Sequence, residues 1–275
     1  MAGPVLTGES IEQETRLHDA LAQIKHVIIV ISGKGGVGKS TVSSHLAMSL
    51  AMKGYETGLM DIDITGPNIP KMFNIEDEQL MADADRMLIP IIVPPRLKVM
   101  SMAFLLPSKD VPVMWRGPIK MSAVQQFIED VRWGKLDYLV IAMPPGTGDE
   151  ALSIVQLIPK ADGIVVVTTP QQVALLDSRK SVGFAAETKI PIIGIIENMS
   201  GFVCPHCGEV TDIFKSGGGA ATAAEFNLQF LGKVPIEPAI VTSGDKGMPV
   251  VISNPDSASA KAFEEITDKI VKTVE

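Results

Sequence analysis

The stretch that decides the fold is Ile31–Leu50, ISGKGGVGKSTVSSHLAMSL, which follows the apolar run HVIIVI and precedes AMKGYETGLMDIDITG. It matches the phosphate-binding pattern G-x-x-x-x-G-K-[ST], with Gly33, Gly38, Lys39 and Ser40 in register. A predicted strand precedes the glycines and a predicted helix follows them. In that context the backbone N–H groups of the turn converge at the positive end of a helix dipole, where phosphate oxygens bind. The motif predicts a nucleotide site; the alternative is an ordinary strand–helix connection.

Each residue of this turn has an expected task. We expect Lys39 to neutralise the β and γ phosphates of ATP and the Ser40 hydroxyl to coordinate Mg²⁺. The backbone is expected to cradle the phosphates through Gly33, Gly35, Gly36, Val37, Gly38, Lys39, Ser40 and Thr41. Lys34 is unusual, because such a loop needs one lysine only. Without further information it is either functional or a solvated surface lysine.

Composition limits the class of protein. The chain has 275 residues, 46% of them hydrophobic and 5% aromatic, with 24 Gly and 19 Pro, which predicts one large α/β domain with many tight turns. The net charge of −8 argues against a nucleic-acid surface, which draws on clustered Lys and Arg. No apolar run approaches the roughly 18 residues of a membrane-spanning helix, and the start lacks a leader pattern. We therefore expect a cytoplasmic protein that binds neither nucleic acid nor membrane.

Short β-branched runs alternate with helical patterns along the chain. The predicted strands are HVIIVI, TGLMD, KVMSM, DYLVIA, GIVVVTT, PIIGIIE and FLGKVP. The predicted helices are Lys39–Lys53, Ile119–Val131, Ala151–Leu157, Gln172–Thr188, Gly218–Glu225 and Ser257–Val274. This alternation predicts an α/β fold of the P-loop NTPase kind, a doubly wound and mostly parallel sheet with helices on both faces, in a single domain of residues 26–275.

Two segments stand outside this pattern. Residues 1–25 are expected to form a separate N-terminal segment, either flexible or an amphipathic helix through Leu17, Leu21 and Ile24. The segment Phe73–Pro95 is poorly periodic and rich in Asp, Met and Pro, which predicts either an insertion or a mobile loop.

Two aspartates follow the second predicted strand, in LMDIDITGPNIP. A spacing of two residues points the carboxylates of Asp61 and Asp63 to the same side. In an open parallel sheet, ligands bind beyond the carboxyl ends of the strands. One carboxylate can then hold a water on Mg²⁺ while the other orients the attacking water. The alternative is a pair of solvated loop carboxylates.

Both cysteines of the chain lie in one Cys-x-x-Cys, at Cys204 and Cys207. In a reducing compartment this spacing favours a metal site, but a tetrahedral metal or a cubane cluster needs four ligands, and the pair supplies half of them. A twofold axis that joins the pairs of two subunits completes the set at a dimer interface, in the predicted loop 201–209. A zinc ion on the same thiolates and a redox dithiol are the alternatives.

Five motifs resemble one family over nearly the whole chain, from Lys25 to the C-terminus: GKGGVGKST, DIDITGPNIP, PPGTGDEAL, ENMSGFVCPHCG and GGG. The first resembles the deviant phosphate-binding loop of the P-loop ATPases that include MinD, the nitrogenase iron protein and the arsenical-pump ATPase. The full set resembles the Mrp/ApbC-type iron-sulfur cluster carriers. The resemblance implies an ATPase that forms a homodimer, in which Lys34 reaches the nucleotide of the other subunit, so that hydrolysis and association are coupled.

The same resemblance implies a cargo. Cys204 and Cys207 of both subunits would bridge a 4Fe-4S cluster, with zinc possible chemically in its place, and the dimer would take the cluster from an assembly scaffold and deliver it to client iron-sulfur apoproteins.

Further site residues follow from the family pattern. Asp63 matches the water-positioning aspartate, which leaves Asp61 for the magnesium ion. Asn198 matches the asparagine that hydrogen-bonds the adenine, a pairing that suits an amide because it offers a donor and an acceptor side by side. Pro235, in GKVPIEP, is expected to line the other face of the base.

One position departs from the family pattern. The family carries an aspartate just before the stretch xPPGTGD, where it contacts the water shell of Mg²⁺ and links loss of the γ-phosphate to loop movement. This sequence has Ala142 there, so we expect impaired ATPase activity. Either the residue is a natural variant for which Asp149 or the pair Asp61 and Asp63 compensates, or it is an introduced change that traps nucleotide. We favour the second.

A different class of protein shares part of this pattern. A MinD-like or ParA-like positioning ATPase would also carry Lys34, Lys39 and Asp63, but it should have a basic amphipathic C-terminus or a basic surface. The tail ASAKAFEEITDKIVKTVE is nearly balanced in charge, and this class leaves the cysteine pair unexplained. A zinc-bridged dimeric regulatory ATPase is the second alternative.

Overall fold

The structure is a computed structural model that describes residues 21–64, 66–106, 117–158, 161–204 and 206–275. Its strands are β1 (Ile24–Ile31), β2 (Thr57–Asp61), β3 (Met81–Ala82), β4 (Leu88–Ile89), β5 (Ile91–Val93), β6 (Leu97–Ser101), β7 (Leu136–Ala142), β8 (Gly163–Thr168), β9 (Ile192–Val203), β10 (Val210–Thr211) and β11 (Phe230–Ile236). Its helices are α2 (Lys39–Met52), α3 (Ile69–Met72), the 3₁₀ turn η1 (Met102–Leu105), α4 (Gly117–Glu129), α5 (Asp149–Gln156), α6 (Gln172–Thr188), α7 (Gly218–Glu225), α8 (Pro238–Asp245), α9 (Val250–Ser253) and α10 (Ala258–Val274). All the strands and helices predicted from the sequence are present.

The main sheet is nine-stranded among the described residues, in the order β10-β9-β8-β1-β7-β2-β6-β5, with β11 also paired to β9. β1 lies between β7 and β8, and the pairs that link β11, β9, β8, β1, β7, β2 and β6 are parallel. The pairs β5–β6 and β9–β10 are antiparallel. The predicted mostly parallel sheet is therefore confirmed, and the carboxyl ends of its central strands meet at one edge.

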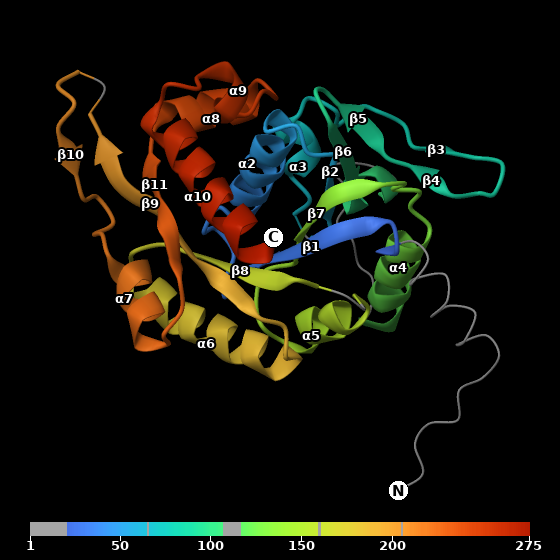
Figure 1. Ribbon diagram of the computed structural model, residues 1–275, viewed down its shortest axis with the longest axis horizontal. Helices are drawn as coiled ribbons and strands as arrows, with labels where there is room; N and C mark the ends of the chain where they lie inside the picture. The colour runs from blue at the N-terminus through green and yellow to red at the C-terminus, as the bar shows by residue number, and fades with distance from the viewer. Residues whose placement is uncertain (1–20, 65, 107–116, 159–160, 205) are drawn as a thin grey trace, which may run out of the picture.

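Helices cover both faces of this sheet (Figure 1). In β1, Ile28 and Val30 pack into the core beneath α2 and α10, whereas Ile29 and Ile31 pack into the core beneath α4, α5 and α6. Successive side chains of a strand point to opposite faces, so a strand buried on both faces must be apolar at every position. This is why the central strands read as continuous apolar runs in the sequence.

The chain enters the sheet earlier than predicted. Ile24 is the first residue of β1, where it pairs with Leu136 and is 4% exposed. The prediction that Ile24 ends an amphipathic helix is wrong, because its side chain is buried as part of the strand. The rest of the predicted N-terminal helix, in residues 1–20, lies outside the described residues.

The segment Phe73–Pro95 is an insertion with its own small ribbon. β3 and β4 pair with each other, and β5 adds to the edge of the main sheet. Arg132 holds the tip of the ribbon through ion pairs with Asp83 and Asp85, the second at 2.7 Å. The prediction of an insertion is therefore the one that these contacts support.

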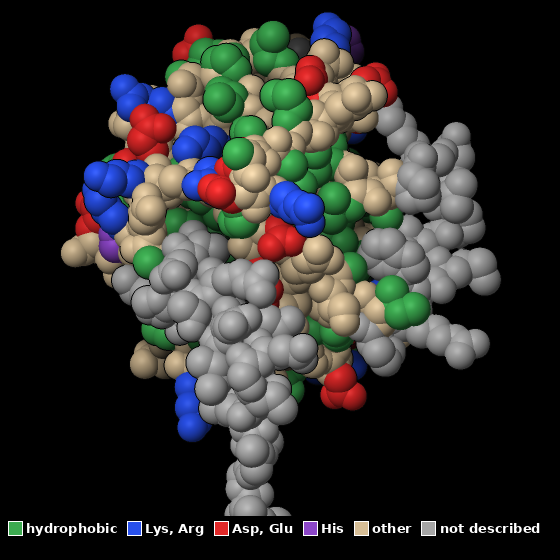
Figure 2. Space-filling view, turned by 90° about the vertical axis from the view of Figure 1, so that its right-hand side faces the viewer, with side chains coloured by type: hydrophobic (Ala, Val, Ile, Leu, Met, Phe, Trp, Pro, Cys, Tyr) green, Lys and Arg blue, Asp and Glu red, His purple; other side chains and the backbone are tan. Residues whose placement is uncertain are grey.

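Among the described residues, no helix is both long and apolar enough to cross a bilayer. Figure 2 shows the face at the right-hand side of Figure 1, where basic side chains lie among acidic ones. On this face the charges do not segregate into a basic surface over the described residues, in contrast to the stripe that nucleic acid binding requires.

Candidate nucleotide site and cysteine hairpin

The loop 32–38 joins β1 to α2 at the carboxyl edge of the sheet. Gly36 and Gly38 have φ angles of 79° and 83°, a left-handed conformation that glycine adopts at little cost. A Cβ atom at Gly38 would lie 2.1 Å from Asn198 Nδ2, so the position also has no room for a side chain. α2 begins directly afterwards, with Val42 N donating to Gly38 O at 2.9 Å. The strand, turn and helix have the geometry of a phosphate-binding loop.

A cavity of about 320 Å³ opens beside this loop. Its lining residues are Ser32, Lys34, Gly35, Gly36, Gly38, Lys39, Ser40, Thr41, Asp63, Gly66, Asn68, Met72 and Pro145. The structure thus brings together both lysines, both hydroxyl residues and one of the two aspartates selected from the sequence. The residues selected for the nucleotide site that lie outside this lining are Gly33, Val37, Asp61, Asn198 and Pro235.

Gly33 and Val37 belong to the loop but support it from behind. A Cβ atom at Gly33 would lie 2.3 Å from Asp177 O of α6, so glycine is required here for packing. Val37 is 2% exposed and packs into the core beneath α2. Both residues fix the shape of the loop rather than face the cavity.

Five lining residues were not given a site role from the sequence: Ser32, Gly66, Asn68, Met72 and Pro145, the last of which belongs to the motif PPGTGDEAL. Gly66 and Asn68 follow Asp63 closely in TGPNIP, and this proximity is the signal that points to them. Asn68 occupies the N-cap position of α3, yet its side chain makes no capping hydrogen bond. Asparagine at such a position ordinarily caps the helix, so its place in the cavity wall shows only in three dimensions.

The ammonium group of Lys39 is buried, and the side chain is 6% exposed. Its Nζ lies 3.6 Å from Asp63 Oδ2, an ion-pair separation, and makes no hydrogen bond to any described residue. A buried ammonium group with unused donors is costly unless an anion completes its bonding. The site therefore fits a phosphate group at this point.

Asp61 is a fully buried carboxylate at the end of β2. Ser101 Oγ donates to its Oδ2 at 2.9 Å, and Asp63 N donates to its Oδ1 at 3.2 Å. Burial raises the pKa of Asp61 from 3.8 to about 6, while the charge of Lys39 opposes the rise. A buried carboxylate is stabilised in its ionised form by a nearby cation. The hydroxyl of Ser40, which lines the cavity, is an oxygen donor of the kind that Mg²⁺ prefers, whereas the buried Asp61 lies behind the lining and would reach such an ion only through water.

Ala142 is fully buried at the end of β7, where it pairs with Asp61 of β2 and Val30 of β1. Residues that pair across parallel strands face the same side of the sheet, so its methyl group points the same way as the Asp61 side chain. Asp149, one of the suggested compensating residues, begins α5, is exposed and does not line the cavity.

Lys34 lies at the cavity and is partly exposed. Ser32 fixes its backbone, because Ser32 Oγ donates to Lys34 O at 3.0 Å. The carbonyl of Ser32 also accepts from Gly146 N at 2.9 Å, which ties the phosphate loop to the PPGTG loop after β7. Pro145 of that loop lines the cavity as well. The two loops therefore meet at Ser32.

Asn198 lies beside the phosphate loop, and Pro235 lies on the neighbouring strand. Asn198 is 4% exposed, and its Nδ2 donates to Val37 O at 2.8 Å. β11 pairs Val234 with Asn198, which puts Pro235 on the neighbouring strand. The two residues predicted to bind adenine are thus on paired strands, one residue out of register, and one amide hydrogen of Asn198 is already used by the loop.

The two cysteines lie in the turn between β9 and β10, at the left of Figure 1. Cys204 N donates to Glu209 O, and Gly208 N donates to Cys204 O, each at 2.9 Å. Both thiols are free, and Cys207 is exposed. The N–H groups of Cys207 and His206 lower the pKa of the Cys204 thiol. In the described part of the chain, no three His, Cys, Asp or Glu side chains gather as a metal site, so the pair is half of a ligand set.

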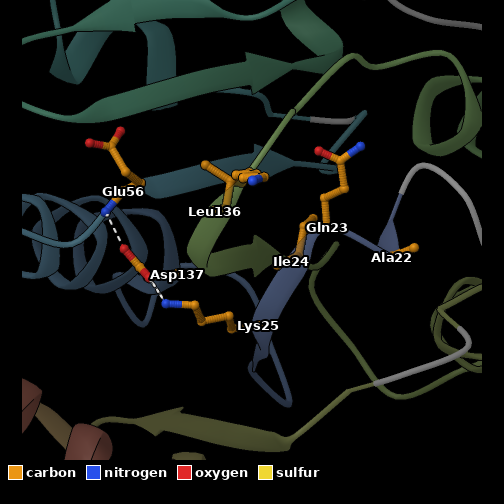
Figure 3. Close-up of a pocket in the computed structure, with 8 residues that line it drawn as sticks. Ala22, Gln23, Ile24, Lys25, Glu56, Leu136 and Asp137 are labelled. Carbon is orange, nitrogen blue, oxygen red and sulfur yellow. Dashed lines mark hydrogen bonds and ion pairs between the residues drawn. The ribbon is translucent and has the colours of Figure 1, made fainter.

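A second cavity, of about 610 Å³, lies at the opposite edge of the sheet (Figure 3). Its lining residues are Ala22, Gln23, Ile24, Lys25, Glu56, Lys135, Leu136 and Asp137. Two of its charged groups pair with each other, because Lys25 Nζ lies 2.5 Å from Asp137 Oδ1, and the backbone Glu56 N donates to Asp137 Oδ2 at 2.9 Å. It lies at the amino ends of the strands, whereas ligands of such sheets bind at the carboxyl ends. The smaller cavity is the candidate site.

The loop geometry, the buried Lys39 and the aspartates at the end of β2 define the class of this protein, a P-loop NTPase. Comparison with known proteins gives the family. The ParA family model, described as NUBPL iron-transfer P-loop NTPase, matches residues 23–271, and the chain belongs to this family. The family predicted from the five motifs is confirmed.

Two similar proteins have names that refer to iron-sulfur clusters. The iron-sulfur cluster carrier protein of Methanocaldococcus jannaschii is 48% identical, over 96% of this chain and 90% of the relative. The cytosolic Fe-S cluster assembly factor CFD1 of Kluyveromyces lactis is 50% identical, over 81% of each. Among solved structures, a nucleotide-binding protein of Archaeoglobus fulgidus in complex with ADP has a TM-score of 0.78 and 36% identity, covering 88% of this chain and 94% of that one.

Proposed function

We propose that this protein is an ATP-hydrolysing carrier of iron-sulfur clusters that works as a homodimer. The observation that carries the proposal is that one strand, β9, touches the phosphate loop through Asn198 and ends in an exposed turn with Cys204 and Cys207. The relatives from Methanocaldococcus jannaschii and Kluyveromyces lactis are named for iron-sulfur clusters, and the Archaeoglobus fulgidus protein binds ADP, which supports this pairing of functions.

In the nucleotide site, each residue has a task that its position allows. The loop N–H groups and the Lys39 ammonium bind the phosphates, which satisfies the unused donors of that buried group. Mg²⁺, held by Ser40 and through water by Asp61, would neutralise charge on the phosphates. Asp63 orients the attacking water, and Lys34 of a second copy adds positive charge to the γ-phosphate. Because Ala142 lacks a carboxylate beside Asp61, hydrolysis is slow.

The cluster is cargo rather than a fixed part of the protein. Two copies of the cysteine turn supply the four thiolates that a cubane cluster needs. The N–H groups that lower the pKa of Cys204 favour the thiolate, which is the ligand form. The exposed position of Cys207 leaves the cluster accessible for transfer to a client apoprotein.

The test is anaerobic reconstitution of the purified chain with iron and sulfide, followed by metal and sulfide analysis, absorption spectroscopy and native mass determination. We expect about four iron and four sulfide per dimer, the composition of a cubane cluster. The double variant Cys204→Ser with Cys207→Ser should lose the cluster, whereas His206→Ala, in the same turn, should keep it. Zinc in place of iron would favour the zinc-bridged ATPase, and a full cluster on a monomer would overturn the shared site.

A further inference from the structure

Glu197 is a fully buried carboxylate of β9 that holds both ends of the cysteine hairpin, residues 201–216. Its Oε1 accepts from Ser200 Oγ at 2.5 Å and from Gly217 N at 2.9 Å, and its Oε2 accepts from Gly219 N at 2.5 Å. Ser200 comes directly before the hairpin, and the two glycines come directly after it. One side chain therefore closes the base of the hairpin.

The glycines of this closure are required by space as well as by hydrogen bonding. A Cβ atom at Gly219 would lie 2.9 Å from Glu197 Cβ, and Gly217 has a φ of 90°. Both N–H groups lie at the start of α7, so the carboxylate also interacts favourably with the positive end of that helix. This contact explains the GGG motif, for which the sequence alone offers no task.

Asn198, the next residue, serves the opposite side of the strand. Consecutive side chains of a strand point to opposite faces, so Asn198 faces the phosphate loop while Glu197 faces α7. Its Nδ2 donates to Val37 O at 2.8 Å, and the contact is possible because Gly38 has no side chain. A single dipeptide thus contacts the loop on one face and the hairpin base on the other.

The backbone between these contacts has little freedom to absorb a movement. β8 pairs Thr168 with Glu197, and β11 pairs Val234 with Asn198, so both residues are fixed in the sheet. Met199 follows with a φ of 56°, a left-handed conformation that a side chain rarely adopts unless its surroundings impose it. A change in the position of the Val37 carbonyl therefore reaches the start of the hairpin.

We infer that Glu197 and Asn198 are a positioning pair that couples occupancy of the phosphate loop to the order of the cysteine hairpin. A bound nucleotide holds the loop backbone around Val37 and Gly38, Asn198 passes this restraint to β9, and Glu197 passes it to both ends of the hairpin. The inference rests on the proposed function in one respect, that Cys204 and Cys207 are the ligands whose order matters.

The test is amide hydrogen exchange of the metal-free chain with and without saturating ADP. The reporters are the amides of Cys204 and Gly208, whose hydrogen bonds close the turn. In the unmodified protein, ADP should slow their exchange about threefold or more, because local opening of the hairpin becomes less frequent. In Asn198→Ala, at an ADP concentration that saturates that variant, the change should be lost. In Glu197→Gln, exchange should be faster even without ADP.

Two controls separate this inference from other effects. Lys39→Ala, which should bind ADP about 100-fold more weakly, must show no response at an ADP concentration that saturates the unmodified protein but not this variant. Lys34→Ala removes the residue expected to reach a second copy, so a retained response in that variant shows that dimer formation is not its source. The inference is overturned if ADP leaves the hairpin amides of the unmodified protein unchanged, or if Asn198→Ala responds as the unmodified protein does. Iron plays no part in this readout, so failed cluster reconstitution would count against the proposed function alone.

Discussion

Ala142 and Asp61 are partners on neighbouring parallel strands, at the carboxyl edge of the sheet and facing the same side. Asp61 is fully buried, and burial already raises the pKa of its carboxyl group to about 6. A second carboxylate at position 142 would lie beside it, and two like charges in a buried place repel each other. Only a bound cation would make that arrangement favourable.

The variant Ala142→Asp should therefore gain activity and lose stability. With Mg²⁺ and ATP, we expect kcat to rise by at least about tenfold, since one positioned charge is worth that much or more in the transition state. Without Mg²⁺, the free energy of unfolding should fall by about 1–3 kcal/mol. Turnover assays and urea denaturation with and without Mg²⁺ measure both effects. Ala142→Asn, similar in size and uncharged, is the control; equal turnover of the aspartate variant and the unmodified chain would show that Ala142 is tolerated.

Lys39→Ala should weaken nucleotide binding strongly. Lys39 is the buried cation at the cavity, and the phosphates lose their main fixed counter-charge without it. We expect ADP and ATP to bind about 100-fold more weakly, which corresponds to roughly 2.7 kcal/mol. Calorimetry measures the affinity. The control is Lys53→Ala, just beyond the other end of α2, where the lysine pairs with Asp268. An unchanged affinity in Lys39→Ala would contradict the assigned site.

His45 should make the protein less stable as the pH falls. It lies in α2, with its Nδ1 2.7 Å from Thr41 O and its Nε2 accepting from Val250 N at 3.0 Å. Complete burial lowers the pKa of His45 from 6.5 to about 4. The unfolded chain therefore binds the proton first, and stability is lost between pH 6.5 and 4, by roughly 3 kcal/mol in total.

The measurement compares urea unfolding of the unmodified protein and His45→Asn between pH 7 and 4. The variant should have a lower free energy of unfolding at pH 7, because it loses buried contacts. The difference in free energy of unfolding between the two proteins should narrow as the pH falls, because only the unmodified protein has the histidine to protonate. His206→Asn, in the exposed cysteine turn, is the matched control and should follow the unmodified protein in parallel. If the difference in free energy of unfolding between His45→Asn and the unmodified protein stays constant with pH, protonation of His45 is not the cause of the loss of stability.

Asp61 should make the protein more stable as the pH falls, the opposite of the effect of His45. Its folded-state pKa lies above the unfolded value of 3.8, so its ionised form is a cost at neutral pH, and stability is gained as the pH falls from about 6 to 3.8. In metal-free protein, Asp61→Asn should be more stable than the unmodified chain at pH 7, by up to roughly 3 kcal/mol, and the difference should close below pH 4. Thermal unfolding across pH tests this, with Asp256→Asn at an exposed position as control. A less stable Asp61→Asn at pH 7 would contradict it.

Lys34→Ala should leave the ATP affinity of a single chain unchanged and lower the rate of ATP hydrolysis by the dimer. If Lys34 acts on the nucleotide of a second copy, a single chain binds ATP normally without it, but hydrolysis in the dimer falls by about 100-fold or more. Mixing this variant with the double variant Cys204→Ala and Cys207→Ala gives dimers with one intact lysine and one intact cysteine pair. Such mixed dimers should hold cluster weakly or not at all. Cluster content equal to that of the unmodified dimer would mean that each chain completes its own ligand set.

The elements of the fold were predictable because their signals are local. A strand buried on both faces needs an apolar residue at every position, and the phosphate loop needs its glycines and lysine at fixed spacing, so both are visible in short windows. The contacts of the site were less predictable. Asn198 meets Val37 across 161 residues, and Glu197 meets Gly219 across 22. No periodic pattern records such pairs, because they follow from how β8, β9 and β11 are ordered in the sheet.

The closure of the cysteine hairpin by one carboxylate makes the hairpin a replaceable part. Since Glu197 fixes both ends of the segment 201–216, the phosphate loop and the sheet apart from the end of β9, β10 and the last pair of β11 do not depend on what the segment contains. A hairpin of different length, or with a different set of ligating side chains, fits the same base provided that Ser200, Gly217 and Gly219 are kept. Under the proposed function, the nucleotide-binding body is thus a platform on which the identity of the cargo can be exchanged, by grafting or in evolution, without redesign of the ATPase.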